Sequence, residues 1–307
     1  MKVLVATVKP FSKEAVAEIK KVVEGAGYEF ALLEKYEDVA QFKEAVKDAD
    51  ALIVRSDKVT PEIVEAGEKL KIVVRAGAGY DNVDLAKCTE KKIVVMNTPG
   101  QNSNAVAELA VGLMISVSRN CFTPGTGSEL KGKTLGIHAY GNVGKLVAKC
   151  GKALGMTVYA FDPFIKDHAV YEKDGVIPAE SVEDLYVKSK FVSLHMPANE
   201  QTKNSINYDL LSKMPKGATL INTARKEVVD EESLKKIFAE RADFRYATDV
   251  APACAEELKK EYPSRFFATP KKMGAETAEA NMNAGIAAAN QIVGFFKEGI
   301  TKFQVNK

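Results

Sequence analysis

The sequence predicts an α/β protein with two doubly wound parallel-sheet domains. Short apolar runs alternate with helix-spaced apolar residues through the first hundred residues. A second alternation follows a long apolar helix and begins with a glycine-rich loop. The length of 307 residues suits two domains of roughly 100–200 residues each.

The N-terminal domain is expected to hold five strands separated by helices. Ser12 is the expected N-cap of the first helix, and Gly25 and Gly27 end it. A second helix is marked by apolar residues at helical spacing from Val39, and Pro61 starts a third. The expected strands are residues 3–8, 30–33, 51–54, 72–74 and 93–96.

Polar residues and glycines follow three of these strands. Parallel sheets of this type bind ligands beyond the carboxyl ends of their strands. The candidates at these positions are Arg55, Ser56, Lys58, Arg75, Gly77, Ala78, Asn97 and Asn102.

The second domain opens with the pattern of a dinucleotide-binding, Rossmann-like unit. An apolar helix over residues 105–119, suited to an interdomain or subunit contact, precedes a strand over 133–137. The loop Ala139-Tyr140-Gly141-Asn142-Val143-Gly144 then opens a helix, and the next strand ends at Asp162. Asp162 lies 21 residues after Gly141, where an acid accepts ribose hydroxyls, which favours NAD over NADP. Ala139 departs from the pattern, which has glycine there.

Composition excludes several classes of protein. Lys and Arg number 43 against 41 Asp and Glu, which argues against a nucleic-acid binder that works through bulk positive charge. The four cysteines are scattered, so we expect neither a metal site nor disulfides. We expect a protein of a reducing compartment. No apolar stretch reaches the ~20 residues of a membrane span, and the first apolar run is broken by Lys9 and Pro10. We therefore expect a cytoplasmic protein.

Several stretches together resemble the D-2-hydroxyacid dehydrogenase family. They lie in the family's order between about residues 50 and 290, and Ile53-Val54-Arg55-Ser56 is most similar to the family's D-3-phosphoglycerate dehydrogenase branch. Because the chain ends at Lys307, the resemblance is to short members that lack regulatory domains. The matching stretches are residues 75–84, Asn97-Thr98-Pro99 with Asn102, Ala107-Glu108-Leu109, residues 130–137, and Asn222-Thr223-Ala224-Arg225 with Val229-Asp230.

The resemblance implies a layout and a reaction. Residues 1–100 and 278–307 would form the substrate domain, with a returning helix over 278–296, and residues 101–277 the NAD domain. The active site would lie in an interdomain cleft, and the protein would be a homodimer. The implied reaction is NAD-dependent oxidation of 3-phospho-D-glycerate to 3-phosphohydroxypyruvate, in L-serine biosynthesis.

The family's catalytic histidine is missing. The family pattern Thr/Ser-Pro-His-x-Gly-Ala corresponds here to Thr269-Pro270-Lys271-Lys272-Met273-Gly274-Ala275, which is one residue longer. Counting from Pro270 selects Lys271 as the acid/base, whereas counting from Gly274 or Asp249 selects Lys272. A lysine base usually titrates near ~10.4, and it works near neutrality when burial or a neighbouring cation lowers its pKa. Both lysines could instead be ordinary solvated loop residues.

Other roles are implied by the same resemblance. Arg225 would hold the substrate carboxylate. Cys254 stands where the family has an orienting glutamate, and Glu256 and Glu257 are close but off register. The implied cofactor residues are Ala78, Tyr140, Gly141, Asn142, Val143, Asp162, His195, Met196, Pro197, Thr223, Ala224, Arg225, Asp249, Gly274 and Ala275, and the substrate residues are Arg55, Ser56, Lys58, Arg75, Gly77, Ala78 and Asn102.

Two alternatives stay open at the level of sequence. The chain could be another D-2-hydroxyacid dehydrogenase, whose substrate has no phosphate. It could also be a non-catalytic NAD-binding interaction protein, because transcriptional corepressors are built on this fold.

Overall fold

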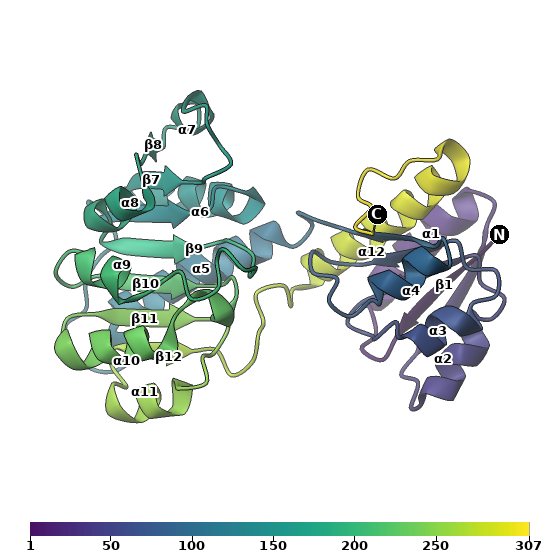
Figure 1. The fold of residues 1–307 in the computed structure, drawn as a ribbon, viewed down its shortest axis with the longest axis horizontal. Coiled ribbons are helices and arrows are strands. Elements are labelled where there is room, and N and C mark those ends of the chain that lie inside the picture. The colour runs from purple at the N-terminus through teal and green to yellow at the C-terminus, as the bar shows by residue number, and fades with distance from the viewer. Residues whose placement is uncertain (307) are drawn as a thin grey trace. The chain divides into compact units, whose positions relative to one another are not determined.

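The computed structural model describes residues 1–306, which form two compact units (Figure 1). Unit 1 contains Met1–Asn102 and the chain from Ala275 onward, and unit 2 is Ser103–Gly274. The cleft expected between the two domains remains a prediction. No helix within residues 1–306 has the length and apolar character needed to cross a membrane.

Unit 1 is built on a five-stranded parallel sheet with the order β2-β1-β3-β4-β5. The strand order reverses between β1 and β3, which makes their carboxyl ends the natural ligand site of this sheet. The strands are β1 (Lys2–Thr7), β2 (Glu29–Glu34), β3 (Ala51–Val54), β4 (Ile72–Arg75) and β5 (Val94–Asn97).

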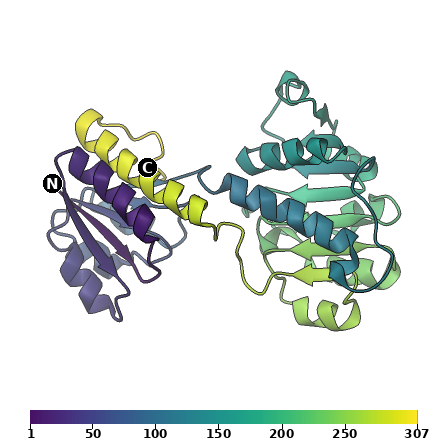
Figure 2. The same ribbon diagram turned by 180° about the vertical axis from the view of Figure 1, so that it is seen from behind.

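Helices cover both faces of this sheet (Figures 1 and 2). Alternate residues of a strand face opposite sides, so Val3 and Val5 pack with α1 (Lys13–Gly25) and α12 (Ala278–Glu298). Leu4 and Ala6 pack on the other face with α2 (Val39–Val46), α3 (Pro61–Ala66) and α4 (Leu85–Glu90). The tail after α12 returns to β5, where the backbone N–H of Val305 donates to the Val95 carbonyl over 2.9 Å.

Unit 2 is built on a seven-stranded parallel sheet with the order β12-β11-β10-β9-β6-β7-β8. The order reverses between β6 and β9. The strands are β6 (Thr134–His138), β7 (Thr157–Phe161), β8 (Ile177–Pro178), β9 (Phe191–Leu194), β10 (Thr219–Asn222), β11 (Arg245–Thr248) and β12 (Phe266–Ala268).

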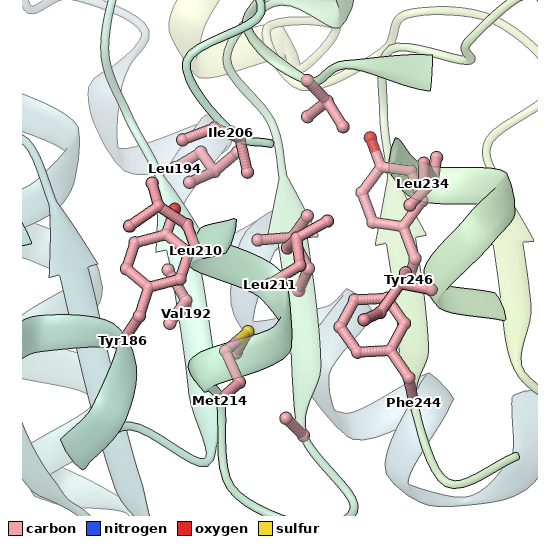
Figure 3. Close-up of a cluster of buried hydrophobic side chains, with 14 of the residues drawn as sticks. Tyr186, Val192, Leu194, Ile206, Leu210, Leu211, Met214, Leu234, Phe244 and Tyr246 are labelled. Atoms are coloured by element: carbon pink, nitrogen blue, oxygen red, sulfur yellow. The ribbon is translucent and has the colours of Figure 1, made fainter. Parts of the chain in front are cut away.

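Two hydrophobic clusters cover the faces of the unit 2 sheet. One face packs against α5 (Ser103–Ser118) and α6 (Asn142–Ala153) (Figure 2). The other packs against α8 (Val182–Lys188), α9 (Tyr208–Lys213), α10 (Glu231–Glu240) and α11 (Ala255–Glu261), and Figure 3 shows its close packing around Leu211. The shorter elements are α7 (Ala169–Glu172), η1 (Asn120–Phe122) and η2 (Lys226–Val228).

The predicted fold class is confirmed by the two parallel sheets. The five strands expected in unit 1 occur within one or two residues of their predicted bounds, and the Ser12 hydroxyl accepts a hydrogen bond from the Ala15 N–H as an N-cap. The helix expected at 105–119 spans Ser103–Ser118, and its apolar side chains pack largely into unit 2's own core. The apolar character of α5 therefore gives no argument for a subunit contact, and the homodimer stays a prediction.

Candidate active site

The residues that follow the strands of unit 2 form a row at the carboxyl edge of its sheet. Strand register places Ala139 beside Asp162 on one side of the reversal point and beside His195 on the other. The same register continues through Thr223, Asp249 and Thr269. Six residues from separate parts of the sequence thus lie along one edge of the sheet. Four of them, Asp162, His195, Thr223 and Asp249, are implied cofactor residues.

The glycine-rich loop has the geometry that a dinucleotide requires. Ala139 adopts a φ of 76°, the left-handed conformation that favours glycine at the first position of the motif. A Cβ on Gly144 would lie 2.3 Å from the Ala139 carbonyl oxygen, so this glycine permits close packing of α6 on β6. A Cβ on Gly141 would meet nothing within 4 Å, and this open space at the N-terminus of α6 suits the pyrophosphate.

Asp162 is held rigidly at the end of β7. One carboxylate oxygen accepts the Tyr140 N–H over 2.9 Å, and the other accepts the Phe164 N–H over 3.0 Å. These bonds fix the carboxylate beside the glycine-rich loop, where it suits the hydroxyls of a ribose and opposes a 2′-phosphate.

Two histidines near the reversal point are neutral at physiological pH. Burial lowers the pKa of His138 to about 4, and its Nδ1 lies 3.2 Å from the Tyr186 hydroxyl. Burial and the nearby His138 lower the pKa of His195 to about 3. His195 Nε2 and the Thr223 hydroxyl are buried without a hydrogen-bond partner among residues 1–306. Buried polar atoms of this kind at a ligand-binding edge fit a polar cofactor group.

Arg225 follows β10 on a turn fixed by Asn222. The fully buried Asn222 side chain accepts the Ala224 N–H and donates to the Arg225 carbonyl, each over 2.9 Å. The Arg225 guanidinium also donates to the Ala224 carbonyl. Sequence reasoning used Asn222 only as part of a motif, whereas the structure shows that it positions the predicted carboxylate-binding arginine.

Asp249 anchors the loop that carries the two candidate lysines. Its buried carboxylate accepts hydrogen bonds from the Thr269 hydroxyl over 2.8 Å, the Met273 N–H over 2.9 Å and the Gly274 N–H over 2.8 Å. The side chains of Lys271 and Lys272 are exposed between these anchored ends. Asp249, one of the implied cofactor residues, thus fixes both ends of the one-residue-longer loop.

Cys254 occupies a buried position at the start of α11. Its backbone N–H donates to Glu231 over 3.1 Å, and burial with the Glu231 charge raises the pKa of the thiol to about 11. The thiol is therefore protonated at neutral pH. Glu256 and Glu257 are exposed on α11.

Unit 1 contains a small basic cavity at the carboxyl ends of its strands. Its volume is about 70 Å³, and Arg55, Ser56, Arg75, Gly77 and Asn102 line it as the sequence predicts for a substrate site. A Cβ on Gly77 would lie 1.5 Å from Arg75 Nη1, so glycine lets the guanidinium lie over the turn. Lys9 also lines the cavity, and sequence reasoning did not select it. Lys58 and Ala78 are exposed and lie outside its lining.

The fold and the carboxyl edge of unit 2 define the dinucleotide-binding half of an NAD-dependent oxidoreductase. Residues 116–271 match the family described as "D-isomer specific 2-hydroxyacid dehydrogenase, NAD binding domain". The chain belongs to the D-isomer specific 2-hydroxyacid dehydrogenase family, and it is an NAD-dependent dehydrogenase of that family. The predicted family, enzyme class and cofactor are confirmed.

Two relatives show how the similarity is distributed. The chain is 39% identical over 275 residues to a hydroxypyruvate reductase of Thermotoga maritima, covering 82% of this chain and 86% of that protein. It is 38% identical over 267 residues to a D-3-phosphoglycerate dehydrogenase of Methanocaldococcus jannaschii, covering 81% of this chain and 50% of that protein. The chain thus spans about half the length of the second relative.

A solved structure covers the whole chain. It is the NAD⁺-bound 3-phosphoglycerate dehydrogenase of Entamoeba histolytica, with 50% sequence identity and a TM-score of 0.88. The match covers 100% of this chain and 99% of that one.

Proposed function

We propose that this dehydrogenase oxidises 3-phospho-D-glycerate to 3-phosphohydroxypyruvate, the entry to the phosphorylated route of L-serine biosynthesis. The basic cavity of unit 1 carries the proposal, because Lys9, Arg55 and Arg75 line it together. A phosphate ester needs such a group of cations, and a small uncharged tail does not. The relatives named as phosphoglycerate dehydrogenases support the same substrate.

The chain supplies an anion-binding group and a proton acceptor. The planar guanidinium of Arg225 suits the substrate carboxylate and the charge that develops on the C2 oxygen. A neutral amine of Lys272, or of Lys271, takes the C2 hydroxyl proton during oxidation and returns it during reduction. Asp249 holds the loop in place for this transfer. NAD, when bound, supplies the acceptor for the C2 hydride.

The cofactor contacts in this proposal come from unit 2. The glycine-rich loop, including Asn142 and Val143, would hold the pyrophosphate at the start of α6, and Asp162 would hold the ribose. His195, Met196 and Pro197 follow β9 and would form a wall of the site. Thr223 and its neighbours would approach the nicotinamide, with the Thr223 hydroxyl supplying the polar contact.

A second candidate is another D-2-hydroxyacid dehydrogenase that acts on an unphosphorylated acid. The relative named hydroxypyruvate reductase, which this chain covers over 86% of its length, favours this alternative. The two candidates differ in the tail of the substrate and share the chemistry at C2.

Initial rates of NADH formation test the substrate. We expect kcat/KM for 3-phospho-D-glycerate to exceed that for D-glycerate and D-lactate by about tenfold or more, because a charge-assisted hydrogen bond contributes to this extent. Lys272→Ala should lower kcat by roughly 10²–10⁴-fold, and Lys271→Ala should retain most activity. Faster turnover of an unphosphorylated acid would reject the proposed substrate, and parent-like activity of both variants would reject lysine acid/base catalysis.

A further inference from the structure

We propose that Lys9 supplies the direct cation for the substrate phosphate, and that Arg55 is a positioning residue that fixes the backbone of Lys9. This inference rests on the proposed function, because it names the residue that selects phosphorylated substrates. It changes the set of substrate residues expected from the sequence, which includes Arg55 and Lys58 and does not include Lys9.

The donors of Arg55 are directed mainly at protein oxygens. Its Nη1 donates to the carbonyls of Lys9 and Pro10, each over 2.9 Å, and its Nη2 donates to the Asn281 side chain on α12. The guanidinium also lies over the Phe11 ring, 5.0 Å from its centroid. Three of the five N–H donors of an arginine are therefore used within the protein. Arg55 connects the Lys9–Phe11 segment to α12, and two of its N–H donors remain for a ligand.

Lys9 lies at the point where a ligand of unit 1 is expected. It follows β1 and Arg55 follows β3, and these neighbouring strands flank the reversal of strand order. The Lys9 carbonyl accepts from Arg55 and from the Thr7 hydroxyl over 2.7 Å, and Pro10 restricts the backbone that follows. The backbone of Lys9 is thus fixed, while its exposed side chain lines the cavity with three ammonium donors.

The cavity matches a phosphate group in size and charge. Its volume is about 70 Å³, and a water-sized group needs about 10–15 Å³, so it has room for roughly five to seven non-hydrogen atoms. A phosphate has five. Lys9, Arg55 and Arg75 carry three positive charges against one negative charge on Glu276, and the surplus balances the charge of about −1.5 to −2 on a phosphate monoester.

Lys58 lies outside the lining of this cavity, next to a buried aspartate. Asp57 is 7% exposed, and one of its oxygens accepts the Val8 N–H over 2.7 Å and the Tyr36 hydroxyl over 2.9 Å. The Lys58 side chain that follows is exposed and is not among the residues that line the cavity.

Steady-state kinetics of single variants test the assignment. Lys9→Ala should raise KM for 3-phospho-D-glycerate about tenfold or more, leave KM for D-lactate within about twofold, and weaken competitive inhibition by inorganic phosphate. Lys9→Arg should restore most of the affinity. Lys13→Ala, which removes an exposed lysine at the start of α1, is the matched control and should behave as the parent. A KM change below about twofold in Lys9→Ala, or an equal or larger change in Lys58→Ala, would overturn the proposal.

A double-mutant cycle tests the positioning role. Arg55→Lys keeps the charge but loses the planar fork, so it should raise KM for 3-phospho-D-glycerate in the parent and have little further effect in Lys9→Ala. Fully additive changes in KM would show that Arg55 binds the phosphate independently and would overturn its positioning role.

Further measurements separate this inference from the proposed substrate. If the parent prefers an unphosphorylated acid, the proposed function fails, and titration calorimetry with inorganic phosphate then tests the phosphate site by itself. Phosphate binding to the parent that is lost in Lys9→Ala would support the assignment of Lys9. Absence of phosphate binding to the parent would overturn it. Faster, Lys9-dependent turnover of D-2-hydroxyglutarate would assign the cavity to a carboxylate and overturn the phosphate.

Discussion

Asp249 is the residue on which the geometry of the lysine loop depends. It is 2% exposed, and its two oxygens accept one hydroxyl and two backbone donors from the loop. A buried carboxylate is stable only when such partners compensate its charge, so the loop and the aspartate fix one another. The extra residue in this loop is therefore accommodated between anchored ends.

The partly buried histidines His138 and His195 make unit 2 sensitive to acid. The pKa of His195 falls from 6.5 to about 3 on folding because of burial and the nearby His138, so the unfolded chain binds more protons at intermediate pH. The free energy of unfolding is unaffected by this group above pH ~6.5, and it decreases as pH falls below that value. At pH 5 the loss is up to about 2 kcal/mol for each such histidine.

Replacing His195 should reduce this acid sensitivity. Urea unfolding of the parent and of His195→Phe at pH 7 and pH 5 should show a smaller decrease in the variant, by up to about 2 kcal/mol. His168→Gln, at an exposed position, is the control and should leave the decrease unchanged. An equal decrease in the parent and in His195→Phe would contradict a neutral buried His195.

At the scale of the element, two glycines of one loop have separable roles. A Cβ on Gly144 would lie 2.3 Å from the Ala139 carbonyl oxygen and 2.9 Å from Ile137 Cγ2, whereas a Cβ on Gly141 would meet nothing within 4 Å. Gly144→Ala should therefore lower the free energy of unfolding by about 1–3 kcal/mol. Gly141→Ala, at the N-cap of α6, should lower stability by at most about 1 kcal/mol and weaken NAD affinity about tenfold or more, because the methyl group would occupy the open space.

Urea unfolding and NADH fluorescence titration of the two variants distinguish these roles. Parent-like NAD affinity in Gly141→Ala would show that the pyrophosphate does not lie against this glycine. Parent-like stability in Gly144→Ala would show that α6 shifts freely on β6.

The elements that the sequence predicted well share a simple pattern. The strands of unit 1 are short apolar runs bounded by polar residues or turns, so their periodicity and their ends are both visible in the sequence. The six-residue helix α4 was missed because it buries only Cys88 and gives no helical repeat. The row from Ala139 to Asp249 could be predicted because each member directly follows a strand.

Other parts of the candidate site depend on contacts that a linear sequence does not show. Lys9 looked like the end of an apolar run, and its place in the cavity follows from the pairing of β1 with β3. The Arg55 guanidinium donates a hydrogen bond to the side chain of Asn281, which lies 226 residues further along the chain. Charge and residue type predict a basic site here, and the strand pairing shows that Lys9 also belongs to it.

At the scale of the whole molecule, the two units have separate cores. Two hydrophobic clusters of the described residues lie wholly within unit 1, and two lie wholly within unit 2. Each unit therefore buries its own apolar side chains without needing the other. The residues that match the NAD-binding family, 116–271, all lie in unit 2.

Independent cores predict that NAD stabilises only one unit. Calorimetry should show two unfolding transitions, and NAD at about 100 times its Kd should add about 2.7 kcal/mol to the one that belongs to unit 2, raising its midpoint by roughly 5–10 °C. The other transition should stay in place, because a ligand stabilises only the state that binds it. Gly141→Ala provides the control, since weaker NAD binding should shrink the shift while the unliganded transitions remain. A single transition that moves as one with NAD would show instead that contacts between the units contribute to the stability of both.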